Sequence, residues 1–96
     1  MKVRWSSKAL SDLDGIRDYS RQQWGARQTA EYLRLIRAAI AAAAHAPLQA
    51  AAADHYRSGY RKTIAGAHRI LFRVNGDTIE IVRILPAAMD IGNRID

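Results

Sequence analysis

The chain has 96 residues, of which 49% are hydrophobic and 25% are charged. This length and composition predict one globular domain over residues 1–96 and exclude a second core or an intrinsically disordered chain. Cysteine is absent, which excludes disulfides, thiol catalysis and cysteine zinc sites. The net charge of +6 favours an anionic partner, either nucleic acid or an acidic protein surface.

Hydropathy indicates a soluble protein without a membrane partner. The N-terminal segment MKVRWSSKAL is too polar for a signal peptide, and no apolar stretch is long enough to span a bilayer. A cytoplasmic location is therefore expected. Much of the apolar fraction is alanine, which predicts a thin core, marginal stability in isolation and a partner that completes the fold.

The first half of the chain predicts a short strand followed by a helical hairpin. Residues 2–5 alternate polar and apolar side chains, as a half-buried strand does, and Ser6 or Ser7 can cap the helix that follows. That helix is expected over 8–24, with an apolar stripe of Leu10, Leu13, Ile16 and Tyr19.

A second helix is expected immediately after the first. Gly25 provides a C-terminal stop for the first helix, and Pro47 ends a second helix over residues 28–45. The tight connection predicts an antiparallel αα-hairpin. The apolar stripe of the second helix contains Leu33, Ile36, Ile40 and Ala43.

The second half of the chain predicts three strands, after a loose loop through Ala53. The expected strands are 60–64, 68–74 and 78–85, separated by turns at Ala65-Gly66 and Asn75-Gly76-Asp77. The element order is therefore β-α-α-β-β-β. The expected fold is an α+β domain in which an N-terminal strand and an αα-hairpin pack on a small antiparallel sheet.

Side-chain alternation across the last hairpin assigns its two faces. If its loop has two residues, opposed residue numbers have an odd sum. The face toward the helices is then expected to hold Ile70, Phe72, Val74, Ile79, Ile81 and Leu85, with His68 and Arg83 near its end. The outer face is expected to hold Arg69, Leu71, Arg73, Glu80 and Val82.

Cofactor and metal chemistry find little support in the sequence. No glycine-rich nucleotide loop is present, and the glycines are spaced as turn residues. His45, His55 and His68 lack the paired spacing of zinc ligands. Neither a cofactor nor a metal is expected.

The sheet half carries most of the positive charge. Six Lys and Arg residues between Arg57 and Arg83 outnumber Asp77 and Glu80 and give that stretch a net charge of +4. Together with the nearby Tyr56 and Tyr60, these cations suit phosphate binding and base stacking. They are equally typical of a solvated face that protects the sheet from aggregation. Both interpretations remain open, and direct nucleic-acid binding stays uncertain.

The order of particular residues along nearly the whole chain resembles the ParE toxins of the ParE/RelE toxin–antitoxin superfamily. The residues that carry this resemblance are Trp5, Ala9, Asp12-Leu13, Ile16, Tyr19, Gly25, Ala30, Tyr32, Pro47, Gly59-Tyr60-Arg61, 67–73, 81–85 and Met89-Asp90. The resemblance implies the same β-α-α-β-β-β order. Many relatives have a histidine directly after the segment Arg83-Ile84-Leu85, where this chain has Pro86, so no role for such a histidine carries over. Many relatives also have a glycine shortly after the proline that ends helix two, where this chain continues Leu48-Gln49-Ala50.

The resemblance offers two activities. RelE-like members cut messenger RNA on the ribosome, whereas ParE-like members resemble them in fold and are understood to poison DNA gyrase without being nucleases. Cleavage needs proton transfer near the scissile phosphate, and Pro86, Ala87 and Ala88 have no group for it. We therefore expect an inhibitor of gyrase rather than an enzyme. The candidates for the alternative ribonuclease, or for a basic nucleic-acid-binding module, are Arg61, Lys62, His68 and Arg69.

The resemblance also implies partners. A ParD-like antitoxin with an acidic tail is expected to form a hetero-oligomer with the chain, mainly through the helices. The candidate antitoxin contacts are Trp5, Leu10, Leu13, Ile16, Trp24, Tyr32, Arg34 and Arg37. The C-terminal end is expected to dock on the target, with candidate contacts at Arg83, Met89, Asp90, Ile91, Arg94 and Ile95.

Overall fold

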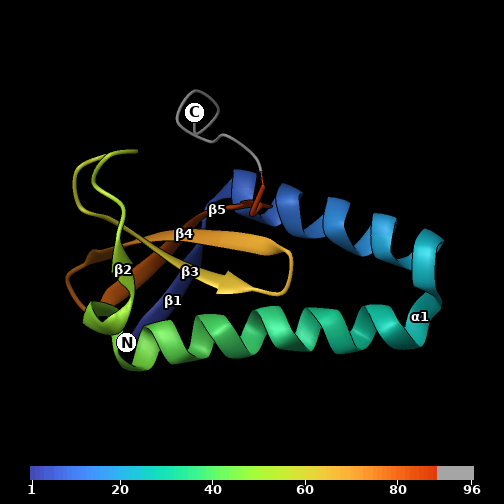
Figure 1. Ribbon diagram of the computed structural model, residues 1–96. Helices are drawn as coiled ribbons and strands as arrows, with labels where there is room; N and C mark the ends of the chain where they lie inside the picture. The colour runs from blue at the N-terminus through green and yellow to red at the C-terminus, as the bar shows by residue number, and fades with distance from the viewer. Residues whose placement is uncertain (89–96) are drawn as a thin grey trace.

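A helical hairpin packs on one face of a five-stranded sheet (Figure 1). The computed structural model describes residues 1–88. In chain order the elements are β1 (Lys2–Trp5), α1 (Ser7–His45), the 3-10 helix η1 (Pro47–Gln49), β2 (Ala51–Ala52), β3 (Tyr60–Ala65), β4 (His68–Asn75) and β5 (Thr78–Pro86). The sheet order is β1-β5-β4-β3-β2. The α+β class and the order of the predicted elements are confirmed, but the short strand β2 is an addition to them. The strand β1 runs parallel to β5, which makes the sheet mixed rather than antiparallel.

The hairpin forms because α1 breaks at one residue. Gly25 has φ 84° and ψ 177° inside the otherwise helical span, a conformation that side-chain-bearing residues rarely adopt. The two arms therefore fold back on each other (Figure 1). At the start of the first arm, the Ser6 hydroxyl accepts from Ala9 N at 3.0 Å and donates to Val82 O at 2.7 Å. The predicted cap and the predicted hairpin are confirmed.

The buried stripe of the first arm differs from the predicted one. Leu13 and Ile16 are buried as expected, but Leu10 is 48% exposed and Tyr19 is 60% exposed. A strict spacing of three residues drifts around a helix with 3.6 residues per turn. Spacings of four, three and four stay on one face, and they select Ala9 and Ser20 as the other buried residues. On the second arm, the predicted stripe is buried in full.

The register between β4 and β5 changes partway along the hairpin. Opposed pairs such as Val74 with Ile79 have the predicted odd sum, but the register shifts beyond the pair of Phe72 and Ile81. This bulge turns Ile84 toward the helices, whereas Leu85 packs on the outer face. The prediction that Leu85 faces the helices is therefore wrong, because the extra residue in β5 places Ile84 on that face instead.

The segment after α1 is more ordered than the predicted loose loop. Ala51 and Ala52 pair with Lys62 and Arg61 to form the short edge strand β2. Ala53 then lies fully buried on the outer face of the sheet in a small second cluster. Within residues 1–88, no helix combines the length and apolarity needed to cross a bilayer.

Candidate functional site

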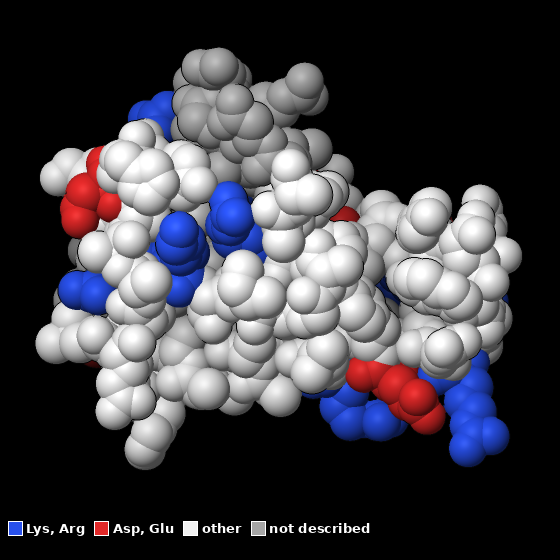
Figure 2. Space-filling model, viewed as in Figure 1, with Lys and Arg blue, Asp and Glu red and all other residues white. Residues whose placement is uncertain are grey.

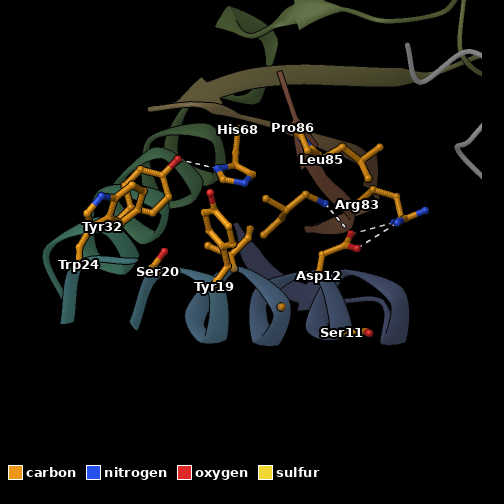
Figure 3. Close-up of a pocket in the computed structure, with 13 residues that line it drawn as sticks. Ser11, Asp12, Tyr19, Ser20, Trp24, Tyr32, His68, Arg83, Leu85 and Pro86 are labelled. Atoms are coloured by element: carbon orange, nitrogen blue, oxygen red, sulfur yellow. Dashed lines mark hydrogen bonds and ion pairs between the residues drawn. The ribbon is translucent and has the colours of Figure 1, made fainter. Parts of the chain in front are cut away.

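A groove of about 510 Å³ lies between the first arm of α1 and the end of β5. Its lining is mainly apolar and aromatic, with a few polar groups at its base (Figure 3). The aromatic and titratable side chains that line the groove include Asp12, Tyr19, Trp24, Tyr32, His68 and Arg83.

Asp12 ties the groove wall on α1 to β5. Its carboxylate accepts from Arg83 Nε at 2.8 Å, from an Arg83 terminal nitrogen at 2.9 Å and from the backbone N–H of Ile84 at 2.9 Å. The side chains of Asp12 and Arg83 are only 15% and 16% exposed. The hydrogen bond with Asp12 raises the pKa of Arg83 above its ordinary value, against a smaller effect of burial. The charges of Asp12 and Arg83 are therefore used to join α1 to β5 within the fold.

Tyr32 fixes the far end of the groove. Its hydroxyl contacts His68 Nδ1, lies 3.3 Å from Ala65 O, and accepts from Ala67 N at 3.0 Å. Gly66 makes this approach possible, because a Cβ there would lie 2.6 Å from the Tyr32 ring. Burial lowers the pKa of His68, and the charge of Asp12 offsets only part of that effect. The imidazole is therefore held mainly neutral near pH 7.

Two aromatic side chains at the rim leave apolar surface open to solvent. Trp24 is 51% exposed and Tyr19 is 60% exposed. Their rings contact each other edge to face, with centroids 6.1 Å apart. Exposed aromatic surface beside a concave apolar groove is typical of a protein-binding site.

The eight predicted antitoxin contacts differ in how accessible they are in the structure. Trp24 and Tyr32 line the groove, and Leu10 is exposed on the same arm of α1. Ile16 also lines the groove, although it is only 8% exposed. Leu13 is buried in the main core and Trp5 packs partly buried against it, so these two have little surface to offer a partner. Arg34 and Arg37 lie exposed on the second arm.

The four predicted ribonuclease residues do not converge. The register places Lys62 and Arg69 on the outer face of the sheet, whereas Arg61 and His68 point to the helix side. Arg61 donates to Ala50 O at 2.9 Å, and His68 contacts Tyr32 across the groove. Figure 2 shows the Lys and Arg side chains of one face as separate spots rather than a continuous patch.

On the outer face, Arg69 is held by its own chain. It donates to the Tyr56 hydroxyl and to Ala87 O, each at 3.0 Å, while its buried Nε has no partner among the described residues. Lys62 lies 5.9 Å from the centre of the Tyr56 ring. Tyr56 therefore lies beside both cations of this face.

Of the predicted target contacts, the structure places only Arg83, which lies in the groove against Asp12. The remaining candidates (Met89, Asp90, Ile91, Arg94 and Ile95) lie outside the described residues. Across residues 1–88, no three His, Asp or Glu side chains gather closely enough to hold a metal ion.

Sequence reasoning missed the polar base of the groove. Asp12 enters the sequence analysis only as part of the family resemblance, yet it binds a strand residue 71 positions away. The contact between Tyr32 and His68 spans 36 residues. Neither pair follows a local pattern, so no signal in a single sequence marks them.

Comparison with known proteins agrees with this architecture. The family model described as "ParE toxin of type II toxin-antitoxin system, parDE" matches residues 3–91. A protein named Toxin ParE1 from Caulobacter vibrioides is 39% identical over 87 residues, which cover 91% of this chain and 90% of the relative. A Toxin ParE1 from Mycobacterium tuberculosis is 40% identical over 91 residues, with 94% and 93% coverage.

A solved structure shows the same fold. It is titled "Chromosomal ParDE TA system from P. aeruginosa" and superposes with a TM-score of 0.78 at 26% identity, covering 90% of this chain and 95% of that chain. Sequence and fold therefore agree over nearly the whole length, and the chain belongs to the ParE toxin family of type II toxin–antitoxin systems.

Proposed function

We propose that the chain arrests growth by binding and inhibiting DNA gyrase, and that a ParD-like antitoxin neutralises it by occupying the groove. The observation that carries the proposal is an open aromatic groove, with Trp24 and Tyr19 about half exposed, in a chain of the ParE family. The solved relative is titled as a ParDE system, which supports an antitoxin as the groove's partner.

The groove suits an amphipathic segment of the antitoxin. Trp24 and Tyr19 supply apolar surface at one end. Below them, the charges of Asp12 and Arg83 are already satisfied within the toxin, so a partner need not desolvate an unpaired charge. The exposed Arg34 and Arg37 lie on the second arm, where acidic residues of the antitoxin can pair with them. The expected result is a hetero-oligomer whose energy comes mainly from the aromatic rim.

Inhibition without catalysis is supported by how the polar groups are arranged. Phosphodiester cleavage needs a proton-transferring group and cations around one phosphate. Lys62 and Arg69 lie on the face opposite His68. His68 is half-buried against Tyr32, and this burial lowers its pKa and so favours the neutral form. The strand β5 is followed by Ala87 and Ala88, which carry no titratable side chain.

The decisive experiment is a supercoiling assay with purified gyrase. The toxin should inhibit supercoiling, and addition of the antitoxin in equal amount should restore it. A ribonuclease assay on translated messenger RNA, run in parallel, should show no cleavage. Loss of transcripts with gyrase unaffected would contradict the proposal and favour the ribonuclease.

A truncation locates the target contact. Removing residues 89–96 leaves the hydrogen bonds of Ala87 with Ala67 and Arg69 in place. We expect this variant to bind the antitoxin but to lose growth arrest. The matched variant with alanine at Arg61, Lys62 and Arg69 should retain most of its toxicity. If the triple variant is inactive and the truncation is toxic, the cations of the sheet rather than the C-terminal end contact the target.

A further inference from the structure

A second partner surface lies at the edge of the sheet, away from the groove. The strand β1 is at one end of the sheet order and pairs only with β5 in residues 1–88. Lys2 N and Ser6 N donate to Asp77 O and Ile81 O, each at 2.9 Å. Because backbone groups of a parallel strand alternate in direction, the N–H and C=O groups of Val3 and Trp5 point to the uncovered edge.

The side chains along this edge alternate in chemistry. The register places Val3 and Trp5 on the helix side, opposite the fully buried Ile79 and Ile81. Val3 nevertheless remains 41% exposed, so apolar surface continues to the edge. On the outer side, Lys2 and Arg4 are both cations, and both are exposed.

The charges around the edge exclude one kind of occupant and favour another. Glu80 is held by Arg73 at 2.8 Å, and Lys2 lies 3.6 Å from Asp77. Arg4 shares a small hollow with Arg73 and Glu80 and forms no ion pair within residues 1–88. A second copy of the chain would bring Lys2 and Arg4 against their own counterparts, and such cations protect a sheet edge from self-pairing. An acidic strand meets no such repulsion.

We propose that β1 accepts an extended segment of the antitoxin as an additional strand, and that this segment alternates acidic and apolar residues. Its acidic side chains lie beside Lys2 and Arg4, and its apolar side chains extend the face formed by Val3 and Trp5. Main-chain hydrogen bonds supply the attachment, and the alternation fixes the register. This inference rests on the proposed antitoxin partnership but concerns a site distinct from the groove.

Amide hydrogen exchange on the toxin–antitoxin complex tests the pairing directly. The Val3 and Trp5 amides should exchange at least about tenfold more slowly in the complex than in the free toxin. The Ser6 amide, which already donates to β5, should change little. Unchanged exchange at Val3 and Trp5 in a complex that still forms would overturn the edge proposal and leave the proposed function intact. Failure of any complex to form would instead contradict the proposed function.

Two double variants with the same change in net charge distinguish a specific contact at the β1 edge from a general effect of charge on antitoxin binding. Reversal of Lys2 and Arg4 to glutamate should weaken antitoxin binding by roughly tenfold. The same reversal at Arg21 and Arg27 alters net charge equally at exposed positions on α1 and should have a much smaller effect. Equal weakening by both double variants would overturn the inference. Slowed exchange at Val3 and Trp5 in a toxin dimer without antitoxin would assign the edge to a second copy and overturn it as well.

Discussion

The groove and the outer face of the sheet use charge in opposite ways. In the groove, Asp12 and Arg83 are mostly buried and make three directed hydrogen bonds that join α1 to β5. On the outer face, Arg73 is 51% exposed and makes one contact with Glu80. In the groove, the charged side chains therefore stabilise the fold, and the remaining apolar surface is available to a partner. The Arg73–Glu80 pair on the outer face leaves the guanidinium largely in water, where an ion pair contributes little stability.

The basic stretch between Arg57 and Arg83 looks different in the sequence and in the structure. In sequence it is one run of six cations, which suggests a single nucleic-acid surface. In the structure, strand alternation and the bulge distribute these cations over both faces. Local charge density in a sequence therefore says little about the charge density of a surface.

The largest expected effect comes from breaking the ion pair in the groove. Asp12→Ala removes the acceptor of three hydrogen bonds, including that of the Ile84 N–H. It should lower the free energy of unfolding by roughly 3 kcal/mol, because partly buried charge pairs are costly to disrupt. Glu80→Ala on the outer face should cost less than about 1 kcal/mol. Urea denaturation of both variants measures the difference, and equal losses would show that the two faces do not differ as described.

A pair of exposed apolar residues tests where the partner binds. Trp24 in the groove and Ile64 on the other side of the sheet are 51% and 54% exposed, so their truncation to alanine should have similar, small effects on stability. Trp24→Ala should weaken antitoxin binding by about 2 kcal/mol, because loss of an aromatic residue that packs in an interface typically costs this much. Ile64→Ala should leave the affinity within a few-fold. Calorimetric titration that shows the reverse order would place the antitoxin elsewhere.

Alanine substitutions at two glycines distinguish the cost of backbone strain from the cost of a clash with Tyr32. Gly66 and Gly76 have similar positive φ values of 57° and 63°, but only Gly66 has Tyr32 within reach of an added Cβ. Substitution with alanine should cost about 1 kcal/mol at Gly76, from φ alone. At Gly66 it should cost about 1–2 kcal/mol more, because the Tyr32 ring has to move. Thermal unfolding measures both losses. Equal losses would indicate that the Tyr32 contact adjusts without cost.

The smallest expected effect is a pH dependence from His68. Burial lowers the pKa of His68 from its ordinary 6.5, so the unfolded chain binds this proton more readily than the folded one. Its contribution to stability is present above about pH 6.5 and is lost as pH falls toward the folded-state pKa. Denaturation midpoints at pH 7.5 and pH 5 should therefore differ less in His68→Gln than in the parent chain. An unchanged difference would exclude His68 as the source.

Local sequence signals specified most of the secondary structure. The Ser6 cap, the break at Gly25, the stop at Pro47 and the turn at Asn75-Gly76 were all predictable. Each depends on the backbone preferences of one or two residues. The antitoxin candidates Trp24 and Tyr32 also line the groove.

Only the tertiary structure decided which distant residues meet. The parallel pairing of β1 with β5, the bulge that separates Ile84 from Leu85, and the contact of Asp12 with Arg83 follow no local rule. For each of these features, short-range backbone preferences allow several arrangements of nearly equal free energy. Packing of the whole core then selects one arrangement. The sequence by itself therefore determined the elements and their order. The groove depends on contacts that span up to 72 residues, and these exist only once the hairpin has packed on the sheet.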